Sequence, residues 1–203
     1  MELLTQVVVS GLTLGSLYAL VGLGFVVIFR ATKVLNFAQG EMMMLGAILA
    51  LYFYSDLNLP YALTFMLAVV LCSAFGGVLE RVAYHPLLKA PIVTLILATV
   101  AVGQMIRAAV RVLRGSEVSR FPSILSAEPF SVAGVSLTPL SLSIIVISVF
   151  LVCAFMLFFR KTKLGKGMEA TSENRDAATL VGIDVNFTYS SIWAASSGLA
   201  AAA

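Results

Sequence analysis

Six long apolar runs, separated by short polar segments, limit what this chain can fold into. A helix rises about 1.5 Å per residue, so about 20 apolar residues cross a bilayer core of about 30 Å. Helices pair their own backbone groups in lipid, and no period-two alternation indicates a barrel. The expected spans are Leu4–Phe29, Phe37–Tyr54, Tyr61–Leu79, Ile92–Leu113, Pro139–Phe159 and Phe187–Ala203. We therefore predict an all-α fold, a polytopic transmembrane helical bundle.

The composition agrees with a protein surrounded by a lipid bilayer. Hydrophobic residues make up 60% of the 203 residues and charged residues only 11%, against about 25% in soluble domains. The net charge of +3 does not indicate a nucleic-acid partner. We treat 1–203 as one transmembrane domain, and because the last run reaches Ala203 without a polar flank, we expect it to be incomplete at the C-terminus.

The basic residues predict an orientation. The segments 30–36, 80–91 and 160–186 carry two, two and five Lys or Arg residues, whereas the alternate segments carry two in total. Basic loops stay in the cytoplasm. This rule places these three segments in the cytoplasm and the N-terminus outside.

Polar residues at the start of the second run allow two interpretations. Asn36 and Gln39 have the spacing of a helix capping box, and Glu41 would face a helix N-terminus, which is a structural role. A carboxylate at the edge of an apolar run also often lines a pathway or pairs across helices, and a tight turn before a short run suits a broken helix. The candidates for a substrate pathway are Asn36, Gln39, Glu41, Thr94, Thr99 and Gln104.

Two further patterns lie on single helix faces. Gly11 and Gly15 form a GxxxG pair, which is typical of close helix packing in lipid. Arg107, Arg111 and Arg114 share one face with Gln104, at the outer end of the fourth run. These arginines either reach the lipid headgroups or form a basic rim that attracts an anionic group or an acidic partner.

The segment 160–186 is the most polar part of the chain and predicts a docking element. Ser172 is a suitable N-cap, a helix of about nine residues follows near 173–181, and Gly182 is a suitable C-terminal stop. So short a helix needs a surface to pack on. A lipid interface is one option, but the alanine-rich side of this helix favours a groove on another protein.

The sequence offers no catalytic centre, and we expect no metal site. His85 is the only histidine, Cys72 and Cys153 are far apart, and no phosphate-binding Gly-x-x-x-x-Gly-Lys-Ser/Thr motif occurs. Two other functions remain as alternatives to primary transport, a passive channel and an ion-coupled carrier. An ion-coupled carrier would need an acidic residue at mid-membrane, and only Glu41 lies near such a position.

Four motifs in order resemble the permease subunits of branched-chain amino acid ABC importers. They are Gly11–Leu20, Asn36–Glu41, Glu80–Pro86 and 164–184, and the chain is similar to the H-type subunit of the leucine/isoleucine/valine system along its whole length. Relatives in this family also import urea, amides and aromatic acids. The family's turn commonly reads Asn-Phe-Ala-His-Gly, so Gln39 in place of His argues against a titratable role there.

The resemblance implies a transporter of several subunits in the bacterial inner membrane. It implies a second related permease, two cytoplasmic ATPase subunits that hold ATP and Mg, and a periplasmic substrate-binding protein. No cofactor is expected in this chain. The resemblance also implies that Gly165–Gly182, within the cytoplasmic coupling loop 160–186, contains the coupling helix. The residues expected near the ATPase are Gly165, Gly167, Glu169, Ala170, Glu173, Arg175, Ala177, Ala178 and Gly182.

Overall fold

The computed structural model describes residues 2–88, 90–115, 130–132 and 135–203, which fold as a helical bundle. The elements matching the six predicted runs are α1 (Glu2–Thr32), α2 (Gln39–Leu51), α3 (Tyr61–Leu79), α4 (Ile92–Arg114), α5 (Pro139–Lys161) and α8 (Val185–Ala202). Two shorter helices, α6 (Lys163–Glu173) and α7 (Arg175–Leu180), connect α5 to α8. The all-α prediction is confirmed, with one small addition: β1 (Phe130–Val132) pairs antiparallel with β2 (Val135–Leu137).

Within the described residues, four helical segments are long and apolar enough to cross a membrane. They are Gln6–Thr32, Tyr61–Leu87, Ile92–Arg114 and Pro139–Lys161. The second includes a π-helical turn, η2 (Glu80–Tyr84), and a 3-10 turn, η3 (His85–Leu87). The other two predicted spans are shorter: α2 has 13 residues before a π-helical turn, η1 (Tyr52–Asp56), and α8 has 18 residues rich in Ser and Ala.

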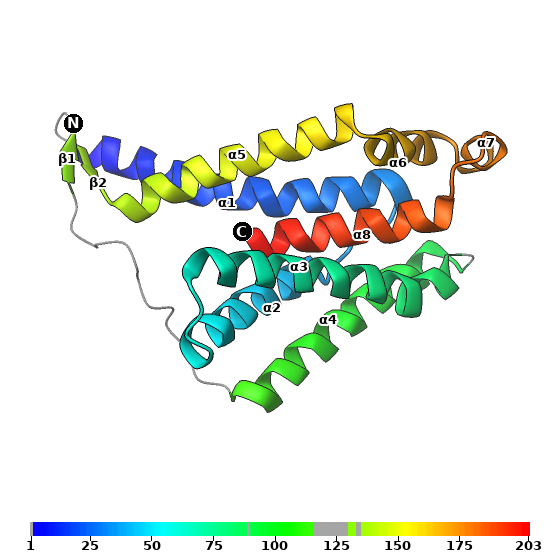
Figure 1. Ribbon diagram of the computed structural model, residues 1–203, viewed down its shortest axis with the longest axis horizontal. Coiled ribbons are helices and arrows are strands. Elements are labelled where there is room, and N and C mark those ends of the chain that lie inside the picture. The colour runs from blue at the N-terminus through cyan, green and yellow to red at the C-terminus, as the bar shows by residue number, and fades with distance from the viewer. Residues whose placement is uncertain (1, 89, 116–129, 133–134) are drawn as a thin grey trace.

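Helix α8 lies between α1 and α3 at the centre of the bundle and packs most extensively on α3 (Figure 1). Small residues allow this close approach. A Cβ at Gly76 would lie 2.1 Å from the Ser197 Oγ, and a Cβ at Gly198 would lie 2.2 Å from the Ser73 Oγ. Small residues at crossings let helix backbones approach in lipid. The Ser- and Ala-rich composition of α8 therefore reflects a central position rather than a lipid-facing one.

The three segments predicted to share one side of the membrane lie at one end of the bundle. The connection after α1, the turns after α3 and the α6–α7 pair are together at the right in Figure 1. The start of α1, the turn between η1 and α3, and the end of α4 lie toward the other end. The alternation predicted from the basic residues therefore agrees with the arrangement of the helices.

The predicted packing of the GxxxG pair is not found among the residues that the structure describes. A Cβ at Gly11 or at Gly15 would meet no atom within 4 Å. The close glycine contacts of α1 occur further along, at Gly24, where a Cβ would lie 2.3 Å from the Gln39 Nε2. Spacing alone marks a face on which a helix can be approached, but it does not identify what approaches it.

Candidate transport pathway and coupling surface

The chain between α1 and α2 turns back into the bundle without helical structure. Helix α1 ends where Lys33 adopts a left-handed conformation with φ of 59°, and the Thr32 Oγ1 accepts a 3.3 Å hydrogen bond from the Val34 N–H. The following residues enter the interior, where Val34, Asn36 and Ala38 are buried. Non-helical backbone at membrane depth requires polar partners from the protein.

Buried polar groups from α1, α2 and α8 meet at this turn. The Gln39 amide donates to the Ser196 carbonyl over 3.1 Å, and the Ser196 hydroxyl lies 3.0 Å from the Gly24 carbonyl and 3.1 Å from the Gln39 Oε1. Gly24 and Ser196 lie 8 and 11 residues from the ends of α1 and α8 near the basic segments, about 12–17 Å at helical rise. The turn therefore lies near mid-depth of a bilayer-spanning bundle.

The predicted capping box at this turn is wrong in detail. Helix α2 begins at Gln39 with Ala38 as its N-cap residue. The Asn36 Oδ1 instead accepts from the Ala38 N–H over 3.1 Å, and the Asn36 amide donates to the Gln39 side chain over 3.3 Å. Gln39 is drawn away from the local backbone because Ser196, a distant residue in the sequence, supplies both a donor and an acceptor.

Helix α4 closes the other side of the turn. The Thr99 Oγ1 accepts a 3.2 Å hydrogen bond from the Phe37 N–H, and a Cβ at Gly103 would lie 3.2 Å from the Glu41 Oε2. Of the six predicted pathway residues, Asn36, Gln39, Glu41 and Thr99 are therefore brought together. Thr94 and Gln104, on the same helix as Thr99, are exposed and lie outside this cluster.

Two ion pairs join α4 to the helical segment α2–η1. Arg107 pairs with Glu41, whose side chain is 11% exposed. Arg114 pairs with Asp56 over 2.5 Å, and its guanidinium lies 5.5 Å from the centre of the Tyr52 ring. Arg107 and Arg114 therefore have acidic partners within this chain, which neither interpretation of the arginines had included. No ion pair is found for Arg111 within the described residues.

A second buried carboxylate, Glu80, lies in the Glu80–Pro86 motif but was not among the predicted site residues. It is 1% exposed, accepts a 2.5 Å hydrogen bond from the Ser190 hydroxyl on α8, and lies 3.0 Å from the His85 Nδ1. Next to it, the Tyr84 and Trp193 rings stack with centroids 4.3 Å apart. The η2 turn is thereby fixed to α8. An acid at the end of an apolar run was the available signal, but its partner follows 110 residues later.

The predicted coupling helix is two helices. Thr162 caps α6 by accepting from the Gly165 N–H over 3.0 Å, and Asn174 caps α7 by accepting from the Ala177 N–H over 3.0 Å. A single helix near 173–181 capped by Ser172 is wrong, because the Ser172 hydroxyl donates to the Glu169 carbonyl inside α6. Asn174 has the extended backbone of an N-cap residue and interrupts the helix.

The predicted stop at Gly182 is confirmed. Gly182 has a φ of 85°, and its N–H donates to the Thr179 carbonyl over 3.0 Å. The following N–H, of Ile183, donates to the Ala178 carbonyl over 3.0 Å. A left-handed glycine with these bonds is a common way to end a helix. Asp184 then caps α8 by accepting from the Phe187 N–H.

The residues predicted to meet an ATPase divide into exposed and buried sets. Glu169, Glu173, Arg175, Ala177 and Gly182 are exposed, and Gly167 and Ala170 are half-buried. Gly165 and Ala178 are buried, and a Cβ at Gly165 would lie 2.4 Å from the Phe159 carbonyl oxygen. Leu180 and Val181, not included in the predicted set, are 88% and 76% exposed.

Helix α6 ties this surface to the membrane helices. It packs on α1, α5 and α8, and its Glu169 lies 3.5 Å from the Arg30 guanidinium of α1. The Arg175 guanidinium at the start of α7 lies 5.5 Å from the centre of the Tyr189 ring of α8. A force on the exposed α7 would therefore reach three long helices through direct contacts. No group of His, Cys, Asp or Glu able to hold a metal ion occurs in the described part of the chain.

An apolar helical bundle with four helices long enough to cross a membrane, counted over the described residues, is the architecture of a multi-pass membrane protein. Residues 7–203 match the family model described as branched-chain amino acid transport system / permease component. The chain belongs to this family. It is a family of transport components, which agrees with the permease expected from the sequence.

Curated relatives carry the same description. The chain is 28% identical over 193 residues to the high-affinity branched-chain amino acid transport system permease protein BraD of Pseudomonas aeruginosa, covering 89% of this chain and 63% of that protein. It is 27% identical over 196 residues to the permease LivH of Escherichia coli, with the same coverage. It is 30% identical over 198 residues to a probable LivH of Methanocaldococcus jannaschii, covering 93% of this chain and 61% of the relative. No solved structure matches the chain.

Proposed function

We propose that this chain supplies the membrane pathway of an ATP-driven importer that carries branched-chain or other hydrophobic amino acids from the periplasm to the cytoplasm. The chain spans about three-fifths of the length of the curated relatives it matches, so the proposal concerns the function to which this part of the permease contributes. ATP and Mg would be held by separate ATPase subunits.

The single observation that carries the proposal is the exposed end of α7. Leu180 is 88% exposed at the end of a six-residue helix. Such a helix is too short to be stable alone in water and is stabilised by its neighbours. Exposed apolar residues on a capped helix suit insertion into a groove on another protein. We assign that groove to an ATPase subunit, because α6 links α7 directly to α1, α5 and α8.

The proposed orientation places α6 and α7 in the cytoplasm. The end of α5 and helix α6, which carry Arg160, Lys161, Lys163 and Lys166, lie at the same end of the bundle as the end of α1 and the connection after it, which carry Arg30 and Lys33. Such basic segments remain on the cytoplasmic side. The N-terminus and the turn after η1 would then face the periplasm. A substrate-binding protein would deliver the solute at that end, where the outer basic face of α4 lies. A second, related permease would complete the membrane part.

The proposed pathway passes the turn at Asn36–Gln39. It combines non-helical backbone, a neutral amide and small residues at mid-depth, which is the construction expected where a solute crosses a membrane protein. Gln39 carries no titratable proton, and Glu41 is paired with Arg107. These two features favour an ATP-driven permease over an ion-coupled carrier, which would need a free acid at this depth.

The test is solute uptake by the complete transporter in proteoliposomes. The complex, with its ATPase subunits and binding protein, would be loaded with ATP or with ADP, and radiolabelled leucine, urea and phenylalanine would be compared as solutes. The proposal expects leucine accumulation with ATP only, unchanged when ionophores collapse ion gradients. Uptake that requires an ion gradient and ignores ATP would contradict it, and uptake of urea alone would contradict the proposed substrate class.

A further inference from the structure

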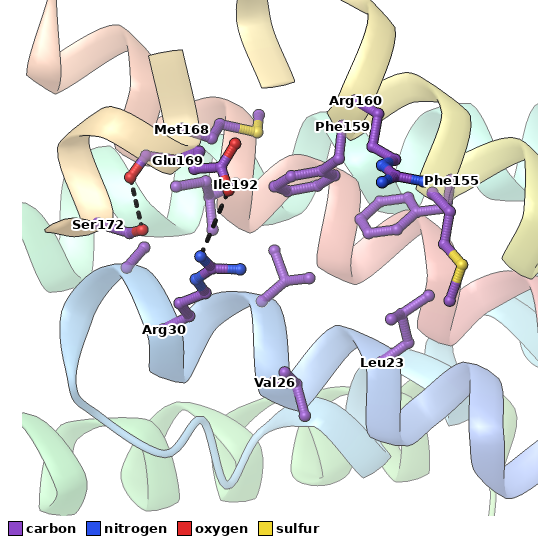
Figure 2. A pocket seen from close by; sticks show the side chains of 13 residues that line it. Leu23, Val26, Arg30, Phe155, Phe159, Arg160, Met168, Glu169, Ser172 and Ile192 are labelled. Atoms are coloured by element: carbon purple, nitrogen blue, oxygen red, sulfur yellow. Dashed lines mark hydrogen bonds and ion pairs between the residues drawn. The ribbon is translucent and has the colours of Figure 1, made fainter. Parts of the chain in front are cut away.

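A pocket of about 390 Å³ opens between the inner ends of α1, α5 and α6, with α8 behind it (Figure 2). Its walls are apolar and come from distant parts of the sequence, including Leu23, Val26, Phe155, Phe159 and Ile192. Its volume lies within the range of roughly 300–1,000 Å³ typical of small-ligand sites. This pocket is separate from the buried turn at Asn36–Gln39, with which it shares no residue.

Charged side chains gather at one edge of the pocket. Arg30 from α1, Arg160 from α5 and Glu169 from α6 line it, which leaves one excess positive charge. Arg30 points toward Glu169 in Figure 2, but the 3.5 Å separation is long and both side chains are more than half exposed. Such a pair is weakly held in water. The Arg30 guanidinium is therefore available to an anion that offers a stronger, bidentate partner.

The polarity of the pocket changes along the membrane normal. Arg30 and Arg160 lie in the last turns of α1 and α5, at the level where these spans end. Leu23 and Phe155 lie seven and five residues deeper, about 10 Å and 8 Å at helical rise. Val26 is 60% exposed and Met156 is 55% exposed, so the apolar part opens sideways. In a bilayer this opening would face the acyl chains.

We infer that this pocket binds an anionic glycerophospholipid. The phosphate would lie between Arg30 and Arg160, and the upper part of one acyl chain would lie against Val26 and Phe159. Basic pockets between transmembrane helices on the cytoplasmic side bind such headgroups. A free amino acid would meet the same charges, but its short side chain would leave the lateral opening unfilled. The inference rests on the proposed membrane orientation and not on the transported solute.

A bound phosphate would compete with Glu169 for Arg30. Glu169 belongs to α6, which connects the membrane helices to the exposed α7. An anionic lipid would therefore release one contact between α1 and α6 without entering the proposed pathway. Lipid charge would then affect coupling to the ATPase rather than solute recognition.

The test is binding of dioleoylphosphatidylglycerol to the purified, delipidated transporter complex, with dioleoylphosphatidylcholine as the neutral probe. The pocket variant combines Arg30→Gln with Arg160→Gln. The matched control combines Arg81→Gln with Lys163→Gln, which removes the same charge from two exposed residues nearby. We expect the pocket variant to weaken phosphatidylglycerol binding about tenfold and the control to change it less than about twofold. Equal weakening in both would indicate diffuse surface attraction and overturn the inference.

A third variant, Val26→Trp, keeps every charge and fills the apolar part of the pocket. We expect a similar loss of phosphatidylglycerol binding with an unchanged thermal midpoint of the complex. If neither this variant nor the pocket variant changed the affinity for phosphatidylglycerol, the lipid would not bind in this pocket, and the inference would be overturned. Displacement of the lipid by inorganic phosphate alone, or by leucine, would reassign the pocket to a soluble anion or amino acid and also overturn the inference.

Discussion

Gly24 is a residue at which the bundle core leaves no space for a side chain. A Cβ there would lie 2.3 Å from the Gln39 Nε2 and 2.9 Å from the Ser196 Oγ. Gly24→Ala would displace the Gln39 amide from Ser196, at a cost of about 1–3 kcal/mol from overpacking. Gly22→Ala is the matched control, because a Cβ there meets nothing within 4 Å. Thermal unfolding should show a lower midpoint for Gly24→Ala only; equal midpoints would contradict the packing described.

The pair of Glu41 and Arg107 gives a second prediction at this scale. Arg107→Gln leaves the Glu41 carboxylate, only 11% exposed, without its cationic partner, and we expect a loss of about 1–3 kcal/mol. Adding Glu41→Gln should recover part of that loss. Arg111→Gln should stay within about 0.5 kcal/mol. Additive losses in the double variant, measured by equilibrium unfolding, would show that the two residues do not interact.

Residue types could be predicted here, but their partners could not. Glu41 was recognised as a costly acid, and its role as a cross-helix pair was one of the two interpretations considered. Arg107 lies 66 residues away and Ser190 lies 110 residues from Glu80. Only the packing of α4 and α8 brings these atoms together, and a single sequence does not encode that packing in any local spacing.

At the scale of elements, the positions of the helices could be predicted from hydropathy, whereas the breaks between helices depend on which residue acts as the N-cap. All six apolar runs became helices near their predicted bounds. The break at Asn174 was missed because Ser172 and Asn174 are both good N-cap residues, and Ser172 instead bonds within α6. The central position of α8 was also missed, because its small residues pack against Gly76 and Ser73 of α3, and the sequence alone does not show this contact.

A substitution in α7 should separate stability from coupling to the ATPase. Leu180→Glu places a charge on a side chain that is 88% exposed, so stability should change by less than about 0.5 kcal/mol. Coupling should fail nevertheless, with substrate-stimulated ATP hydrolysis reduced about tenfold. Leu180→Met keeps an apolar contact and should retain most of the activity. Normal stimulation in the Leu180→Glu complex would remove α7 from the coupling surface.

The orientation of the whole bundle across the membrane can be tested by labelling its two ends. The basic segments lie at one end of the bundle and the turn containing Asn58 lies toward the other. After replacement of Cys72 and Cys153, Lys163→Cys should react with a membrane-impermeant maleimide only from the cytoplasmic side. Asn58→Cys, in the exposed turn, should react only from the periplasmic side. Reaction of both from one side would contradict the proposed topology.

The central claim is that an ATPase subunit contacts this chain through α7. A photoreactive amino acid in place of Leu180 tests it directly, with the same residue in place of Val70, a 59% exposed position within α3, as the control. Cross-linked products of the assembled transporter would be identified by mass spectrometry. The account predicts that position 180 captures the ATPase and position 70 does not. Failure of position 180 to capture it, while the complex is intact and active, would contradict the account.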